Sequence, residues 1–225
     1  MNINDRKTPG VSEENVEVKF DSRFIRVMDL QYAPGKHYLD ATRRKPEDLV
    51  ATKTDEDFRA MLPDAVSCVV ILELPGEEPR LLLSHEFRYP AGRYLLSVPA
   101  GLIDDRDRTE EDPVLATAVR EIREETGLEV TKEDSINIIN PLLFSTPGMT
   151  DESNALVCAV LHLPDLSALS QDGAEGSEKF DGFSLMTRKE AGETLRRGRD
   201  EAGNFYSVYT WAALLFFLSD MWKRE

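Results

Sequence analysis

Three glutamates stand close together in the run from Arg120 to Leu128. Glu121, Glu124 and Glu125 are spaced i, i+3 and i+4, so a helix would place them on one face. Like charges on one face destabilise a helix, and neighbouring arginines or a divalent cation could offset the repulsion. Oxygen ligands on a rigid face suit a hard ion such as Mg²⁺ or Mn²⁺. The spacing alone leaves two interpretations open, a metal site and a solvated, salt-bridged helix face.

The helix that carries these glutamates has clear ends in the sequence. It is predicted over residues 113–126, with Pro113 in the first turn, where a missing N–H costs nothing, and Gly127 as its stop. Val114, Ala118 and Ile122 supply apolar contacts on its other side. Upstream, a short predicted strand over residues 94–98 runs into Pro-Ala-Gly-Leu-Ile-Asp, so strand, loop and helix form one module.

This module resembles the signature of the Nudix hydrolases, which is a glycine, five residues, a glutamate, seven residues, then Arg-Glu-apolar-x-Glu-Glu-x-Gly-apolar. Arg120 to Leu128 matches the second half at every fixed position, and Gly101 matches the leading glycine. Counting eight residues back from Arg120 places Asp112 where the family has glutamate, and the loop before it is five residues longer than the pattern. The resemblance implies an α+β fold, the Nudix α/β/α sandwich with a mixed sheet, plus an N-terminal β element.

Two further segments resemble the ADP-ribose pyrophosphatases. Residues 85–90 followed by 96–101 are similar to their "Q-x-R-x-P … E-x-P-A-G" segment, and residues 145–152 to their "S-P-G-x-S-x-E" loop. The resemblance implies an enzyme that hydrolyses the diphosphate linkage of a nucleoside diphosphate derivative with Mg²⁺, first of all ADP-ribose to AMP and ribose 5-phosphate. The alternatives are another sugar nucleotide or a dinucleotide as substrate, or a Nudix-fold ligand-binding module without catalysis.

The resemblance also implies roles for individual residues around the metal. The expected metal ligands are the carbonyl of Ala100 and the side chains of Glu121, Glu124 and Glu125. In this subfamily the general base comes from the mobile loop before the last short strand. Glu178 is the first choice and Glu175 the second, against the alternative of two solvated loop acids; Glu125 is a further option, and Arg120 is counted with the catalytic group.

Substrate contacts are expected from two other segments. Arg88 is the first candidate for phosphate or ribose, because a planar guanidinium suits anionic oxygens. Gly148 and Met149 are expected to offer backbone groups, and Glu152 to bond the ribose or a metal water. An aromatic side chain should stack on the base, and the sequence does not choose among those near the N-terminus.

The chain divides into two predicted domains. Residues 1–63 form an N-terminal β element with a helical insertion at about 44–62, and residues 64–225 form the Nudix domain. A capping box of Thr187 and Glu190 begins one helix near the C-terminus. The last helix, about 206–223, carries an apolar stripe that is predicted to lie in the core. The stripe consists of Trp211, Leu214, Leu215, Leu218 and Trp222.

Charge and composition limit the partners. With 27 basic and 42 acidic residues, the formal net charge is −15, which repels nucleic acids and anionic membranes, so neither is expected as a partner. Residues 1–17 are too polar for a signal peptide, and Cys68 and Cys158 are predicted as buried free thiols, so a cytoplasmic location is expected. The N-terminal strands have little helix to cover them, which predicts a homodimer.

Overall fold

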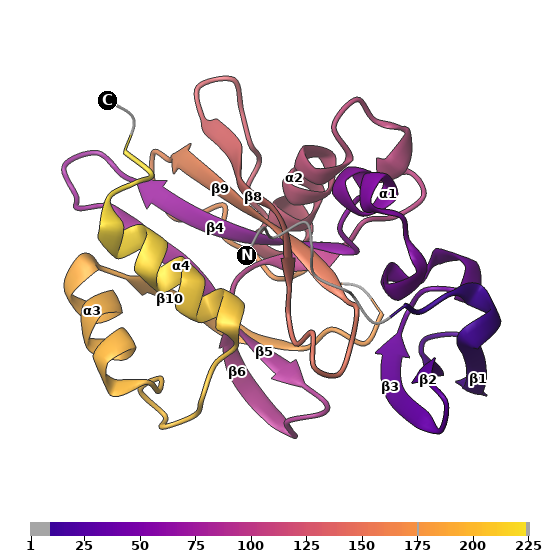
Figure 1. The fold of residues 1–225 in the computed structure, drawn as a ribbon. Helices are drawn as coiled ribbons and strands as arrows, with labels where there is room; N and C mark the ends of the chain where they lie inside the picture. Colours follow the sequence, from indigo (N-terminus) through magenta and orange to yellow (C-terminus); the bar gives the residue numbers. More distant parts are fainter. Residues whose placement is uncertain (1–9, 175, 224–225) are drawn as a thin grey trace, which may run out of the picture. The chain divides into compact units, whose positions relative to one another are not determined.

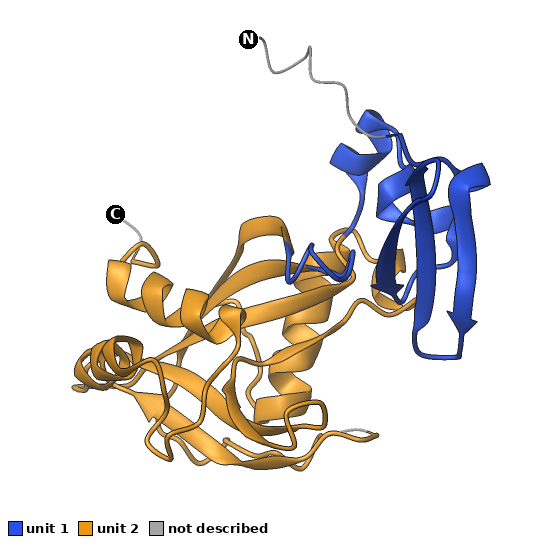
Figure 2. Ribbon diagram, turned by 60° about the horizontal axis from the view of Figure 1, so that its bottom comes forward, with its two compact units in different colours: residues 1–62, 144–153 blue, residues 63–143, 154–225 orange. Residues whose placement is uncertain are grey.

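The computed structural model describes residues 10–174 and 176–223 (Figure 1). The chain forms two compact units: the first takes residues up to Leu62 together with Phe144–Ser153, and the second takes Pro63–Leu143 and Asn154 onward (Figure 2). The sequence predicts one domain for residues 64–225. In the structure the loop at 144–153 belongs to the N-terminal unit, because its polar groups bond to residues 38–50.

The first unit is built on a three-stranded antiparallel sheet in the order β1-β2-β3. Short helices follow in the segment expected to hold a helical insertion, and α1 begins where the Thr54 side chain accepts a hydrogen bond from Asp57 N. A small core contains Met28, Leu30 and Leu49. The elements are η2 (Glu13–Asn15), β1 (Val16–Asp21), β2 (Arg26–Ala33), β3 (Lys36–Thr42), η3 (Pro46–Asp48), η4 (Val50–Thr52) and α1 (Asp55–Ala60).

The second unit contains a seven-stranded sheet in the order β10-β5-β4-β9-β8, with β6 paired to β5 and β7 to β4. The central β4 runs parallel to β9 and antiparallel to β5 and β7, so the sheet is mixed, as predicted. The strands are β4 (Ala65–Glu73), β5 (Arg80–Arg88), β6 (Arg93–Ser97), β7 (Ala100–Leu102), β8 (Ser135–Phe144), β9 (Ser153–His162) and β10 (Phe180–Met186).

Helices cover both faces of this sheet. They are η5 (Asp107–Thr109), α2 (Pro113–Thr126), α3 (Arg188–Arg197) and α4 (Val208–Ser219). The bounds of α2 are those predicted, and Gly127 ends it in the left-handed conformation, with φ of 73°. The predicted capping box at Thr187 and Glu190 opens α3.

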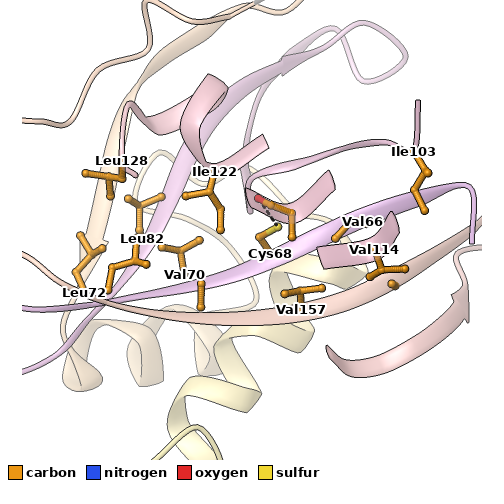
Figure 3. Close-up of a cluster of buried hydrophobic side chains, with 14 of the residues drawn as sticks. Val66, Cys68, Val70, Leu72, Leu82, Ile103, Val114, Ile122, Leu128 and Val157 are labelled. Atoms are coloured by element: carbon orange, nitrogen blue, oxygen red, sulfur yellow. Dashed lines mark hydrogen bonds between the residues drawn. The ribbon is translucent and has the colours of Figure 1, made fainter. Parts of the chain in front are cut away.

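Alternate residues of β4 and β5 point to opposite faces of the sheet and belong to two separate hydrophobic cores. Val70 and Leu82 pack under α2 with Ile122, whereas Val69 and Leu81 pack under α4. The first of these cores is drawn in Figure 3, where Cys68 lies beneath α2. Cys68 and Cys158 are both buried free thiols, as predicted. The α+β class and the α/β/α sandwich are therefore confirmed.

The C-terminal helix differs from its prediction. Leu214 and Trp222 are buried, but Trp211 is 48% exposed and Leu215 is 38% exposed. The reason is that α4 carries apolar residues on all sides, while only one side faces the sheet, so a list of apolar positions could not identify the buried ones. Within residues 10–174 and 176–223, no helix combines the length and hydropathy needed to cross a bilayer.

Candidate active site

The glutamates of α2 lie where this helix meets β7. Glu121 and Glu125 are only 5% and 3% exposed, and the backbone N–H of Ala100 donates to Glu125 Oε1 at 3.3 Å. Gly101 leaves the space that Glu121 occupies, because a Cβ at that position would come 1.7 Å from Glu121 Oε1. Because Ala100 and Gly101 are small, the backbone of β7 can approach the buried carboxylates of Glu121 and Glu125.

Arg120, whose side chain is mostly buried, joins the acidic side chains of this region. Its Nη1 bonds Glu121 Oε1 at 2.5 Å and Glu124 Oε2 at 2.9 Å, and its Nη2 donates to the carbonyl of Leu102 at 2.9 Å. Burial lowers the pKa of the guanidinium, but these carboxylates and Asp107 outweigh that effect and raise it. Arg120 is thus the positive charge that offsets the crowded glutamates, one of the two possibilities that the sequence raised.

The structure corrects the alignment of the long loop. Asp107, not Asp112, pairs with Arg120, with 2.8 Å between Asp107 Oδ2 and Arg120 Nη2. Asp107 is the sixth residue after Gly101, so counting forward from the glycine, rather than back from Arg120, would have found it. Asp112 instead caps α2, where its Oδ1 accepts hydrogen bonds from the next helical N–H groups. The extra residues of the loop lie between these two aspartates.

A second set of charged side chains comes from the sheet. On β5, Glu86 and Arg88 alternate with Leu82 and so face the side covered by α2. Phe180 of β10 lies opposite Glu86, and Phe87 N donates to Lys179 O at 2.8 Å, so the same register continues past the end of β10. This register places Glu178 opposite Arg88.

Four carboxylates from three elements thus form one cluster. We call Glu86, Glu121, Glu125 and Glu178 the carboxylate cluster. Burial, together with the other members of the cluster, raises the pKa of Glu125 well above its usual range, and burial raises the pKa of Glu121 to about 7. Burial also raises the pKa of Glu86, and Glu178 adds to that increase. Three of its members, Glu86, Glu121 and Glu125, are buried, whereas Glu178 is exposed at its edge.

Such a cluster fits the divalent metal that the sequence predicts. Glu125 Oε2 is buried and has no hydrogen-bond partner, which is unusual for a carboxylate oxygen. As the side chains stand, no three acidic, His or Cys groups within residues 10–174 and 176–223 surround a common point as metal ligands would. In this arrangement Arg120 bonds both Glu121 and Glu124. The residues that could hold an ion are Glu121, Glu124, Glu125 and the Ala100 carbonyl.

The remaining predicted substrate residues lie in the first unit. Tyr38 of β3 donates to the carbonyl of Gly148 at 2.8 Å, and Ala41 N donates to the carbonyl of Met149 at 2.9 Å. Glu152 pairs with Arg43 at 2.9 Å. These bonds fix the loop to β3. Glu175, the second candidate for the general base, falls outside the described residues.

A cluster of charges completes the attachment of this loop. Asp151 N donates to Asp40 Oδ1 at 3.1 Å, and Asp151 Oδ2 lies 3.5 Å from Arg44 Nε. Burial and the neighbouring Asp151 raise the pKa of Asp40 to about 6. We call Asp40, Arg43, Arg44, Asp151 and Glu152 the loop cluster. The sequence did not show it, because its members come from two segments far apart in the chain.

Comparison with known proteins gives the second unit a family. Residues 61–209 match the NUDIX domain. An uncharacterized Nudix hydrolase of Schizosaccharomyces pombe is 33% identical over 96 residues, which cover 43% of this chain and 42% of that protein. The ADP-sugar pyrophosphatase of Mus musculus is 28% identical over 117 residues, 52% of this chain and 50% of its own. The ADP-ribose pyrophosphatase of Bacillus subtilis is 26% identical over 129 residues, 57% and 60% of the two chains.

The matched region is only part of each relative, since these alignments span 42% to 60% of the relatives' lengths. A crystal structure of an ADP compounds hydrolase shares the fold, with a TM-score of 0.55 and 20% identity over 92% of this chain and 91% of that one. The domain match covers well over half of the chain and includes the helix of glutamates, the glycine before it and Arg88. The chain therefore belongs to the Nudix family.

Proposed function

We propose that this chain hydrolyses the diphosphate linkage of a nucleoside diphosphate derivative, with ADP-ribose as the first candidate substrate, giving AMP and ribose 5-phosphate. One observation carries the proposal: strand register brings Arg88 and Glu178 together on the sheet face that α2 covers. Arg88, as the cation for the diphosphate, and Glu178, as the carboxylate for proton transfer, thus lie beside the glutamates of α2. The relatives named for ADP-ribose and ADP-sugar hydrolysis support the choice of substrate class.

The residues of the second unit take distinct parts in this proposal. Glu121, Glu124, Glu125 and the Ala100 carbonyl would hold a magnesium or manganese ion, which would neutralise charge on the diphosphate and lower the pKa of a water. Arg88 binds phosphate oxygens through its guanidinium, which is about half exposed. Glu178 accepts the proton of the attacking water at its carboxylate. Arg120 keeps the α2 carboxylates oriented.

A panel of substrates tests the proposal. ADP-ribose, an ADP-hexose, UDP-glucose and a diadenosine polyphosphate are incubated with Mg²⁺ or Mn²⁺, and the released nucleotide and sugar phosphate are measured. Fastest turnover of ADP-ribose supports the first candidate. Faster turnover of an ADP-hexose favours the alternative substrate suggested by the relative from Mus musculus. Tight binding of ADP-ribose without any product would establish the non-catalytic alternative instead.

The general base is tested by substitution. Glu178→Gln should lower turnover on the order of a hundredfold or more while Mg²⁺ binding persists, since general-base contributions are typically 10²–10⁴. Glu175→Gln serves as the comparison. If Glu175→Gln is inactive and Glu178→Gln is near wild type, the base has been assigned to the wrong loop residue.

We also propose that the chain forms a homodimer through its N-terminal sheet. Several large apolar side chains of this unit are exposed, among them Phe20 at 53%, Phe24 at 69% and Leu39 at 58%. Sedimentation should show a dimer, and Phe20→Asp should shift it toward a monomer. A compact monomer of 25.4 kDa for the wild type would contradict this proposal.

A further inference from the structure

Glu86 is a buried acid for which the proposed function has no use. It lies on β5, two residues before Arg88, and its Oε2 is 2.5 Å from Arg88 Nη2. The Glu86 side chain is 10% exposed, whereas the Arg88 side chain is 47% exposed. Because residues i and i+2 of a strand share a face, both side chains stand on the face that α2 covers. The buried carboxylate of Glu86 therefore forms an ion pair with the half-exposed guanidinium of Arg88 at the edge of the carboxylate cluster.

Neighbouring strands hold Glu86 in place. Leu95 of β6 lies opposite it on one side and Phe180 of β10 on the other. Ser97 of β6, whose hydroxyl donates to Leu95 O at 3.5 Å, is the diagonal neighbour of Glu86 on the same face. Glu86 is thus fixed by strands on both sides, whereas the long Arg88 side chain stands at the end of β5 and depends on Glu86 for its ion pair.

Arg88 would lose much of its order without this contact. An exposed arginine side chain samples many rotamers, and fixing such a side chain upon binding weakens affinity by several-fold to about tenfold. Glu178, which continues the register with β5 two residues before the start of β10, is a competing carboxylate. A fixed partner at position 86 selects one direction for the guanidinium.

We propose that Glu86 is the positioning residue of Arg88, holding its guanidinium preorganised for the phosphate oxygens of the substrate. The inference rests on the proposed function, in which Arg88 binds the diphosphate. Substitutions at position 86 can show whether Arg88 needs the negative charge of Glu86 or only a hydrogen-bond acceptor. A glutamine at position 86 keeps an oxygen that accepts from Arg88, whereas an alanine keeps none.

Steady-state kinetics separate these effects. Glu86→Ala should raise KM for ADP-ribose about tenfold and lower kcat by less, because ordering of Arg88 contributes mainly to binding. Glu86→Gln should return KM to within about threefold of wild type. Glu78→Ala, an exposed glutamate before the start of the same strand, is the matched control and should not change KM. An unchanged KM in Glu86→Ala would overturn the proposal.

A double-mutant cycle tests whether Glu86 acts through Arg88. If it does, Glu86→Ala added to Arg88→Ala should produce no further rise in KM. Additive effects would overturn the proposal. So would a Glu86→Gln variant as impaired as Glu86→Ala with a smaller stabilisation by Mg²⁺, since that result would make Glu86 part of the metal site.

A spectroscopic measurement makes the test independent of the substrate. The side-chain Nε–H resonance of Arg88, assigned by its loss in Arg88→Ala, should be sharp and protected from exchange in the wild type and in Glu86→Gln. It should broaden in Glu86→Ala, and a sharp signal there would overturn the proposal. If the wild type fails to hydrolyse ADP-ribose while this pattern holds, the proposed substrate fails and the Glu86–Arg88 pairing stands.

Discussion

The carboxylate cluster of the second unit and the loop cluster of the first unit use buried acids in opposite ways. In the carboxylate cluster, Glu121 and Glu125 stand on one helix, and the buried Oε2 of Glu125 has no hydrogen-bond partner. In the loop cluster, Asp151 lies beside Arg44, Glu152 pairs with Arg43, and the bonds tie a loop to β3. The first arrangement raises the free energy of the folded state, whereas the second joins two distant segments of the chain.

This difference shows how a structural cluster can be told from a reactive one. A structural cluster holds nearly as many cations as anions and connects parts of the chain. The cluster that we propose to be reactive gathers anions from several elements, and burial raises the pKa of both Glu121 and Glu125, whereas in the loop cluster the raised pKa of Asp40 stands beside two arginines. The following substitutions sharpen this contrast, in order of decreasing expected effect.

The largest effect is expected at Glu125. Glu125→Gln should lower hydrolysis of ADP-ribose by at least roughly a thousandfold, ~4 kcal/mol in the barrier, because a bound ion loses an anionic ligand. The melting temperature without metal should stay equal or rise, since one of several crowded, buried carboxylates loses its charge. Steady-state assays and melting curves with and without Mg²⁺ measure both. An active variant, or one with unchanged Mg²⁺ stabilisation, would remove α2 from the proposed metal site.

Asp107 tests the ion pair with Arg120 beside the carboxylate cluster. Asp107→Ala should cost about 3 kcal/mol of unfolding free energy, because Arg120 keeps its buried position and loses a buried carboxylate partner. Urea unfolding measures the loss. A change below about 1 kcal/mol would mean that Glu121 and Glu124 suffice to hold Arg120.

The loop cluster should respond to pH through Asp40. Its pKa is about 6 in the folded chain against an ordinary 3.8, so protonation favours the folded state, and stability declines as the pH rises through 6. Asp40→Asn should therefore stabilise the protein by roughly 2 kcal/mol at pH 8 and by little at pH 4. Melting curves across this range measure the effect. Exposed Asp48→Asn is the control, and a pH-independent gain at Asp40 would contradict the assignment.

The smallest effect is expected at Asp112. Asp112→Ala removes the cap of α2 and should cost about 1 kcal/mol, without disturbing Arg120. Urea unfolding beside Asp107→Ala gives the comparison. If Asp112→Ala proves the more damaging of the two, the long loop has been assigned wrongly, and Asp112 rather than Asp107 is the partner of Arg120.

Much of the second unit could be predicted from the sequence because its signals are local. The helix over residues 113–126 has its proline, its glycine and its spaced glutamates within a single segment. The three-residue strand at Ala100–Leu102 was missed, since so short a segment has no periodicity of its own and forms by pairing with β4. The apolar stripe of the last helix was predicted as core without knowing which side of α4 would face the sheet.

The glutamates of α2, the glycine before that helix and the family could all be read from the chain, because each is specified by residue types at short spacing. Which other acids lie beside α2 depends on the folded arrangement of distant segments. Glu86 and Glu178 reach the same face through strand register, and Asp107 reaches Arg120 through the fold of a long loop. Contacts between residues distant in sequence depend on how strands pair and loops close. No local pattern records that geometry, so it appears only when the whole chain has folded.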